Sequence, residues 1–343
     1  MRIAGLLRRT AFAGTLLACG SGAAALAQGT GSATLDAVRA HRQLACGVSG
    51  EAPGFSLADS QGVMRGLDAD MCRAVAAAAL GDAKLVRFVP LSPVNRFTAL
   101  QSGEVDILVR STGWTLTREA SLGLLMAFVN FHDGTGIAVK ADNGVKSAKE
   151  LDGATVCILP GTSTELDVGD YFRAQKLSFS PVLIDGVTSV EQAFLSGRCD
   201  AWANDASYLQ AFQKIRGAST ITVLPERISS DPVGALVRKG DDRWFDLVRW
   251  TGYALLTAER VGVTRANVDE KRSGQDTAVQ RLLGAQGDLG KALGVDNAWA
   301  YNVIKQVGNY GELWNQDIAP LGIERGPNRL ASDGGLMYAP PLR

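Results

Sequence analysis

Apolar residues follow two kinds of spacing along the first part of the chain. Residues 67–80 (LDADMCRAVAAAAL) place apolar side chains three and four positions apart and are followed by Gly81, which predicts a helix and its end. Short continuous apolar runs at 105–109 (VDILV) and 154–160 (ATVCILP) predict buried strands. Because such strands alternate with helical segments, we expect α/β sheets whose strands are mostly parallel.

The alternation of helix and strand occurs twice. Residues 97–109 (FTALQSGEVDILV) and 191–203 (EQAFLSGRCDAWA) each contain a helical segment that ends in Ser-Gly and leads through an Asp into an apolar strand. This internal similarity predicts two α/β units of similar winding. Two later segments, 243–259 and 298–314, have helical spacing without strands, so we expect them to pack back on the first unit.

The predicted fold is therefore a two-lobe α/β protein, with a sheet flanked by helices in each lobe. Two connections, near Ile137 and Asp231, would cross between the lobes and form a hinge. Sheets of this kind bind ligands beyond the carboxyl ends of their strands. The expected boundaries are 28–137 for the first part of lobe 1, 138–232 for lobe 2, and 233–343 for the return to lobe 1 and a C-terminal helical extension.

The first residues have the composition of an export signal. A basic start with three arginines, an apolar middle and the sequence Ala25-Leu26-Ala27 predict a signal peptide over 1–27. Residues 16–19 (LLAC) also approach a lipoprotein signal, in which Cys19 would carry the lipid. Of the two products, we expect the soluble periplasmic one.

The charge balance narrows the range of partners. The chain has 35 Lys and Arg residues against 35 Asp and Glu residues, and the expected signal peptide contains three of the arginines and no acid. A near-neutral mature chain argues against nucleic acid or an anionic membrane as the main partner. No later stretch approaches the roughly 18 consecutive apolar residues that span a bilayer.

Four cysteines follow the expected signal peptide: Cys46, Cys72, Cys157 and Cys199. In an oxidising compartment an even number suggests two disulfides, and four cysteines allow three pairings. We favour Cys46 with Cys72 and Cys157 with Cys199, because each pair then lies within one half of the chain. The alternative is that some of them are small buried residues with free thiols.

Candidate catalytic and metal sites are scarce in this sequence. His41 and His132 are the only histidines, and neither belongs to an HExxH, GxSxG or paired-cysteine motif. No GxGxxG or Walker-type loop follows the early strands. The sequence therefore predicts neither a metal nor a cofactor, and it favours binding over catalysis.

One candidate binding segment, at 160–167 (PGTSTELD), lies between a predicted strand and a predicted helix. Thr162 and Glu165 have the spacing of a capping box, which is a purely structural role. With Thr162 as the cap, Ser163 and the free backbone N–H groups of the first helical turn would still offer a site for an anion. A carboxylate would suit this site.

Two charged residues complete the candidate site. Asp205 follows the strand predicted at 198–204 and would pair with an ammonium group, unless it only caps the next helix. Arg118 follows several hydroxyl side chains, and its guanidinium would bind a carboxylate through two hydrogen bonds. Arg110 competes for that role. A cation, an anion-binding helix start and an acid together predict a receptor for a zwitterion, an α-amino acid.

Ordered segments along the mature chain resemble the periplasmic amino-acid-binding proteins of ABC importers, and most closely the general L-amino-acid-binding branch. The similar segments include GVMRGLDADMCRAVAAAALGD, RFTALQSGEVDIL, TGWTLTREASLG, CILPGTSTELD, SGRCDAWANDAS and AYNVIKQVGNYGELW. The resemblance implies the type II periplasmic-binding-protein fold, whose two lobes close over an L-amino acid. It also implies a membrane permease as the recipient, and we expect a monomer.

The resemblance assigns roles to individual residues. Those implied at the ligand's charged groups are Arg118, Thr112, Thr115 and Thr162 for the α-carboxylate and Asp205 for the α-ammonium. Phe55 and Trp114 are implied beside the ligand's side chain.

This sequence departs from the family pattern at two places. In many relatives the binding arginine comes five residues after the hydroxyl that matches Thr115, whereas Arg118 follows it by three, so Arg110 remains in competition. Glu51 lies near the side-chain end of the expected site and would face either the ligand or solvent, and we favour solvent.

Two rival functions use the same scaffold. Cyclohexadienyl dehydratases resemble these binding proteins, and such an enzyme would need an acid in the cleft, for which Glu51 or Glu165 are candidates. A sensor that presents the bound amino acid to a receptor would have the same site and differ only in its partner.

Overall fold

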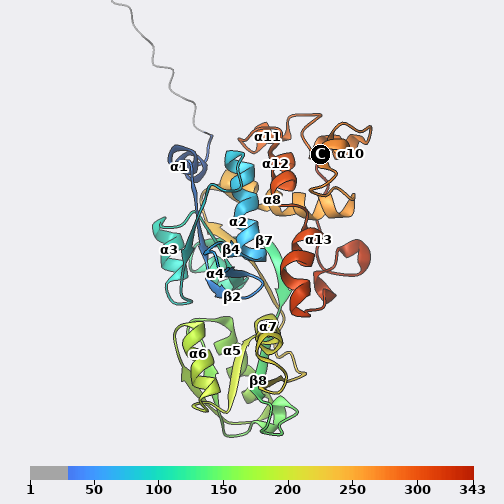
Figure 1. The fold of residues 1–343 in the computed structure, drawn as a ribbon. Coiled ribbons are helices and arrows are strands. Elements are labelled where there is room, and N and C mark those ends of the chain that lie inside the picture. The colour runs from blue at the N-terminus through green and yellow to red at the C-terminus, as the bar shows by residue number, and fades with distance from the viewer. Residues whose placement is uncertain (1–29) are drawn as a thin grey trace, which may run out of the picture.

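The computed structural model describes residues 30–343, which form two α/β lobes placed one above the other in Figure 1. The expected signal peptide over 1–27 and the alternative lipid site at Cys19 lie outside the described residues. Each lobe is built on one five-stranded sheet with helices packed against it.

The sheet of lobe 1 has the strand order β5 (Val86–Pro90), β1 (Leu44–Val48), β6 (Ile107–Gly113), β13 (Asp231–Arg238), β7 (Leu124–Asp133). Strand β1 is parallel to β5 and to β6, and β13 is antiparallel to both of its neighbours. The first part of the chain thus forms the parallel half of the sheet. The antiparallel half consists of β7, which leads to lobe 2, and β13, which returns from it.

Lobe 2 repeats this plan. Its strand order is β10 (Phe179–Leu183), β9 (Ala154–Ile158), β11 (Ala201–Asp205), β8 (Thr135–Lys140), β12 (Ile221–Val223). The pairs of β9 with β10 and β11 are parallel, and those of β8 with β11 and β12 are antiparallel. The carboxyl ends of β9 and β11 therefore open at the same edge, toward lobe 1.

Helices cover both sheets. Those of lobe 1 are α1 (Ala33–His41), α2 (Leu67–Leu80), α3 (Arg96–Ser102), α4 (Leu116–Ala120) and α8 (Asp242–Arg260). Those of lobe 2 are α5 (Ser163–Gln175), α6 (Val187–Leu195) and α7 (Ala206–Arg216). Helix α2 carries an alanine-rich apolar sequence and is buried on nearly all sides, against β6, α8 and the C-terminal extension.

The C-terminal extension packs on lobe 1 through short helices, which lie beside α2 and α8 in Figure 1. They are α9 (Val268–Arg272), α10 (Thr277–Leu282), α11 (Leu289–Ala292), α12 (Trp299–Gln306), α13 (Tyr310–Leu313), the π-helical turn η2 (Trp314–Ile318) and the 3₁₀ turns η3 (Ala319–Leu321), η4 (Gly326–Asn328) and η5 (Ala331–Asp333). A further 3₁₀ turn, η1 (Ala148–Glu150), belongs to lobe 2. Within the extension, η3 reaches α7 of lobe 2.

The chain passes between the lobes at two points that lie side by side. The first is Gly134, between β7 and β8, which is earlier than the boundary expected after Ile137. The second runs through Ser229 into β13, whose first residue, Asp231, already pairs within the sheet of lobe 1. A Cβ atom on Gly134 would lie 2.2 Å from the carbonyl oxygen of Ser229, so only glycine permits this approach.

The two disulfides each lie within one lobe. Cys46 of β1 is bonded to Cys72 of α2, with their Cα atoms 6.2 Å apart. Cys157 of β9 is bonded to Cys199, just before β11, with their Cα atoms 5.6 Å apart. The pairing that we favoured from the sequence is confirmed, and neither bond crosses the hinge.

A small three-stranded sheet, β2 (Glu51–Ala52), β3 (Ser56–Ala58) and β4 (Met64–Arg65), follows β1. Gly66, which precedes α2, has a φ angle of 116°, and a Cβ atom there would lie 2.4 Å from the backbone of Phe55. This close contact fixes Phe55 between the small sheet and the start of α2.

Candidate functional site

A polar cleft lies between the lobes, at the carboxyl ends of β6, β9 and β11. Of the residues proposed from the sequence, the structure brings five to this cleft: Phe55, Arg118, Thr162, Ser163 and Asp205. Phe55 and Arg118 come from lobe 1, and the other three come from lobe 2. A ligand in this cleft would therefore touch both lobes.

The structure places three of the proposed residues elsewhere. Thr112 is fully buried and donates its hydroxyl to the carbonyl of Arg110, 3.2 Å away. Thr115 caps α4 by accepting from the backbone N–H of Arg118. Trp114 is 48% exposed and lines a separate groove on lobe 1. None of the three lines the cleft.

A bulge in β6 explains the difference. Val109 and Thr112 pair with consecutive residues of β13, so Arg110 and Ser111 between them are extra residues in the strand. Ser111 has a φ angle of 42°, in the left-handed region that favours glycine. Arg110, Ser111 and Gly113 therefore all reach the cleft, which the alternation of a regular strand would not permit.

A buried acid holds the bulge in place. Asp68, in the first turn of α2, accepts from the backbone N–H and the hydroxyl of Ser111 at 2.9 and 3.1 Å, and from the amide of Asn130 at 2.8 Å. Burial raises the pKa of Asp68, and these hydrogen bonds oppose the rise. The strained backbone at Ser111 is thus stabilised from beneath the cleft.

Arg118 lies where the two lobes meet. Its Nη1 donates to the carbonyl of Gly113 at 2.7 Å, and its guanidinium stacks on Phe97, 5.2 Å from the ring centroid. A Cβ atom on Gly113 would lie 3.0 Å from Nη1 of Arg118 and 3.4 Å from Oγ of Ser163, which belongs to the opposite lobe. Burial lowers the pKa of Arg118, and the charge of Asp205 opposes this effect most strongly.

The start of α5 offers donors from lobe 2. Thr162 is the N-cap, because its hydroxyl accepts from the backbone N–H of Glu165 and donates to the carbonyl of Leu159. Glu165 accepts from the N–H of Gly161 and not from that of Thr162, so the capping box is only half formed. The N–H groups of Ser163 and Thr164 have no acceptor among the described residues, which leaves them available to an anion.

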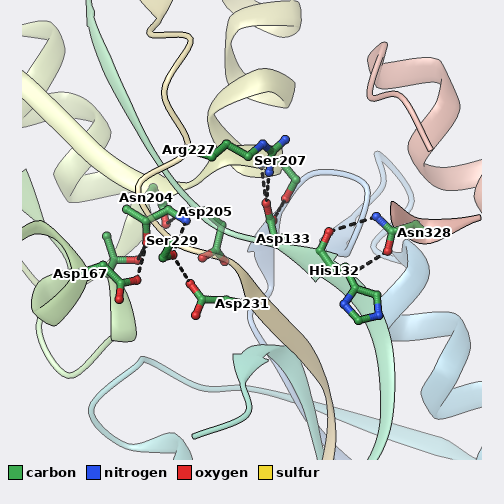
Figure 2. Close-up of polar contacts among 12 residues, drawn as sticks. His132, Asp133, Asp167, Asn204, Asp205, Ser207, Arg227, Ser229, Asp231 and Asn328 are labelled. Carbon is green, nitrogen blue, oxygen red and sulfur yellow. Dashed lines mark hydrogen bonds and ion pairs between the residues drawn. The ribbon is translucent and has the colours of Figure 1, made fainter. Parts of the chain in front are cut away.

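Asp205 ends β11 at the N-cap position of α7, but its carboxylate does not cap that helix. The cap comes instead from Asp133, at the end of β7, which accepts from the backbone N–H and the hydroxyl of Ser207 and pairs with Arg227 (Figure 2). Asp205 is therefore left free for a partner in the cleft.

The hinge places other acids around Asp205. Asp231 accepts from the hydroxyl of Ser229 at 2.5 Å, and Asp167 accepts from that of Thr135 at 2.8 Å (Figure 2). Burial raises the pKa of Asp205 to about 8, and the charges of Asp133 and Asp231 add to the rise. A half-buried carboxylate that is surrounded by other acids favours a cationic partner.

Two further contacts join the lobes at the rim of the cleft. Glu51 accepts from the backbone N–H of Val187 at 3.2 Å and from the hydroxyl of Thr188 at 2.9 Å, both in the first turn of α6. Arg96 of α3 donates to the carbonyl of Gly161 at 3.1 Å. Glu51 thus faces the opposite lobe, which is neither of the two positions considered from the sequence.

The described residues, 30–343, show neither a metal cluster nor a membrane-spanning helix. No group of three His, Cys, Asp or Glu side chains in this range is placed to hold a metal ion. The helices of the same range include none that is long and apolar enough to cross a membrane.

The structure has two α/β lobes, which are joined by two crossing segments and enclose a polar cleft. This arrangement defines a hinged binding protein, which holds a small molecule between its lobes. The chain belongs to the bacterial extracellular solute-binding proteins, family 3, which match residues 44–260.

Relatives of known name extend the similarity beyond residues 44–260. YhdW of Escherichia coli K12, named as an amino-acid ABC transporter-binding protein, is 50% identical over 321 residues, or 92% of this chain and 94% of that one. AapJ of Rhizobium johnstonii, named as a general L-amino acid-binding periplasmic protein, is 44% identical over 337 residues, or 96% of this chain and 99% of that one.

A solved structure is similar in fold as well as in sequence. It is an ABC transporter periplasmic binding protein from Brucella ovis with glutathione bound, which superposes with a TM-score of 0.87 at 45% identity. The superposition covers 90% of this chain and 99% of that one.

Proposed function

We propose that this protein is a periplasmic receptor that captures L-amino acids between its lobes and delivers them to the permease of an ABC transporter. The observation that carries the proposal is the cleft itself, where Arg118 and the free N–H groups of α5 face Asp205. An anion site beside a half-buried acid matches the two charges of an α-amino acid. The names of the relatives support the same ligand class and the same kind of partner.

Closure of the lobes performs the capture. Burying a zwitterion removes the water that solvates both charges, and this cost is offset only when each charge finds a partner in the protein. Arg118 binds the α-carboxylate together with the first turn of α5, and Asp205 binds the α-ammonium. Because these partners belong to different lobes, the ligand holds the closed form together.

Calorimetric titration of refolded, ligand-free protein with the common L-amino acids tests this function. Arg118→Ala and Asp205→Ala should each abolish the heat of binding, while Arg198→Ala, at an exposed position of lobe 2, should leave it unchanged. Wild-type affinity in both site variants would refute the assignment, and no heat with any amino acid would refute the ligand class.

Glutathione is a second candidate ligand, because the similar Brucella ovis structure has it bound. Its γ-glutamyl end carries the same α-ammonium and α-carboxylate groups as a free amino acid. Adding glutathione to the same titration series distinguishes the two ligands by their relative affinity.

The proposed function includes no catalysis. The acids considered for a dehydratase have other contacts, since Glu51 binds the start of α6 and Glu165 binds Gly161. Neither lines the cleft. Incubation with prephenate or arogenate should yield no phenylpyruvate or phenylalanine. Detectable turnover would instead support the dehydratase function.

The proposed location and state are a soluble, monomeric protein of the periplasm. N-terminal sequencing of the exported protein should begin near residue 28, whereas a lipid-modified Cys19 at the N-terminus would indicate the anchored form. Transport and sensing are separated by reconstitution with the permease: uptake that depends on this protein supports transport.

A further inference from the structure

The cleft holds more positive charge than an α-carboxylate needs. Arg96, Arg110 and Arg118 all line it, with exposed fractions of only 2%, 7% and 8%. None of the three takes part in an ion pair within residues 30–343. Asp205 is the one carboxylate among the described residues that line the cleft. Buried cations without paired anions are costly unless a ligand supplies the negative charge.

The hydrogen bonds of Arg96 and Arg110 leave most of their donors unused. A guanidinium has five N–H groups. The Nε of Arg110 donates to the carbonyl of Leu91 at 2.7 Å, and Nη2 of Arg96 donates to that of Gly161 at 3.1 Å. The Nε of Arg96 is buried and has no partner. Each side chain thus makes one hydrogen bond to the backbone, and Arg96 also stacks on Phe97, 4.6 Å from the ring centroid. The remaining donors of both line the cleft.

The three arginines do not share one position. Asp205 is the acid whose charge acts most strongly on both Arg118 and Arg110, and it also acts on Arg96. The other acids differ: Asp231 and Asp167, at the hinge, act on Arg118, whereas Asp68 and Glu51 act on Arg110. Arg110 thus extends the positive charge of the cleft from the hinge toward the rim, where Glu51 binds the start of α6.

Asp68 binds Ser111, the neighbour of Arg110, but does not neutralise Arg110 through a contact. Its carboxylate oxygens are bonded to Ser111 and Asn130, and the two residues form no ion pair. Glu51 is likewise bonded to the start of α6. Neither acid replaces an anion in the cleft.

We propose that Arg96 and Arg110 form a second anion subsite, which binds a second carboxylate of the ligand. This inference rests on the proposed capture of an α-amino acid in the same cleft. The second carboxylate is carried by the side chain of L-glutamate or L-aspartate, or by the far end of a γ-glutamyl peptide. Neutral amino acids leave the subsite without a counter-charge, and basic ones are repelled by it.

Titration with matched ligands tests the subsite. L-glutamate and L-glutamine have nearly the same shape and differ in the terminal charge, so their affinity ratio measures the subsite directly. We expect the wild type to bind L-glutamate about 10- to 100-fold more tightly, the range for a charge-assisted hydrogen bond in a buried site. γ-Glutamylglycine, as a third ligand, shows whether a peptide carboxylate is preferred to that of a side chain.

Variants distinguish the contribution of the second anion subsite to binding from that of the rest of the cleft. Arg110→Gln should bring the ratio of the two affinities below about 3 while L-glutamine still binds, because Arg118 and Asp205 are intact. Arg110→Lys keeps the charge and should restore part of the preference. Arg198→Gln, on the exposed surface, should leave both affinities and their ratio unchanged.

The outcomes distinguish this inference from the proposed function. Equal binding of L-glutamate and L-glutamine by the wild type, or an unchanged ratio in Arg110→Gln, overturns the second anion subsite but leaves amino-acid capture standing. No binding of any amino acid overturns both. Circular dichroism of each variant, together with its retained binding of L-glutamine, verifies that it is folded.

Discussion

At the scale of single residues, the site is a compromise between binding and stability. Asp205 is half-buried at the end of β11 without a hydrogen bond to its carboxylate, close to the acids of the hinge. Such a group costs free energy in the closed, ligand-free protein, where it must either hold a proton or bury a charge. The ligand's ammonium group removes that cost.

This cost predicts how Asp205 affects stability. Its pKa is about 8 in the folded protein and near 3.8 when unfolded, so the folded state binds more protons between these values. The free energy of unfolding therefore falls as pH rises from about 4 to about 8. Asp205→Asn, which carries no charge, should remove this fall and raise the melting temperature at pH 7 by several degrees, since 1 kcal/mol corresponds to roughly 2–4 °C.

Calorimetry of ligand-free protein at pH 4.5 and 7.5 measures the effect. Asp170→Asn, an exposed acid in the same lobe, is the control and should melt as the wild type does. A melting temperature of Asp205→Asn that is unchanged or lower at pH 7.5 would contradict the assigned cost.

Residue types were easier to predict than the direction of their side chains. The charged groups Arg118 and Asp205 and the capping Thr162 were identified because charge and capping chemistry are local properties of the sequence. Ser111 and Gly113 were missed, and Thr112 was chosen in their place. The cause is the bulge in β6, which depends on pairing with β13, more than 100 residues away.

At the scale of elements, the lobes are joined by a helix cap supplied from outside the helix. The first turn of α6 follows Gly186, which has no side chain to cap it, and Glu51 from lobe 1 accepts from that turn instead. The contact joins residues of both lobes, so a separation of the lobes would break it. It stabilises the closed form without touching the ligand.

Removing this cap should lower the affinity for every ligand by the same factor. A lost helix cap costs about 0.5–2 kcal/mol, which corresponds to roughly a 2- to 30-fold rise in Kd. Glu51→Ala should show this rise by calorimetry with both an acidic and a neutral amino acid, and Glu104→Ala, an exposed glutamate of lobe 1, should not. A rise confined to one ligand would mean that Glu51 contacts that ligand's side chain.

Most of the helices and strands could be predicted from the local spacing of apolar residues, but the strands at the crossing between the lobes could not. Strands β7 and β8 together form one apolar, extended stretch interrupted by a single glycine, so hydrophobicity does not mark where the chain leaves lobe 1. The small sheet after β1 has strands of only two or three residues, which are too short to show an alternating pattern in the sequence.

At the scale of the whole molecule, the hinge is narrow and closely packed. The two crossing segments meet at Gly134 and Ser229, and Asn328 of the C-terminal extension binds the backbone of His132 just before the crossing, through bonds of 2.6 and 3.1 Å. Motion between the lobes must therefore occur around a short, well-supported axis.

A side chain at Gly134 should disturb both folding and closure. In Gly134→Ala the added carbon would meet the Ser229 carbonyl, and forcing the strands apart costs about 1–3 kcal/mol. We expect a lower melting temperature and a higher Kd for all ligands. Gly169→Ala, in α5 with open space around it, is the matched control and should be neutral or stabilising. Wild-type melting of Gly134→Ala would show that the hinge tolerates displacement.

The contact of Glu51 with the start of α6 also allows ligand binding in the cleft to be detected at the protein surface. Ser189 is exposed and lies two residues after Val187, whose backbone N–H binds Glu51. A solvent-sensitive dye on a Ser189→Cys variant would change its emission as lobe 1 docks on this turn and leaves it. The dye would not touch the bound molecule, so the same labelled protein would serve as an optical gauge of ligand concentration.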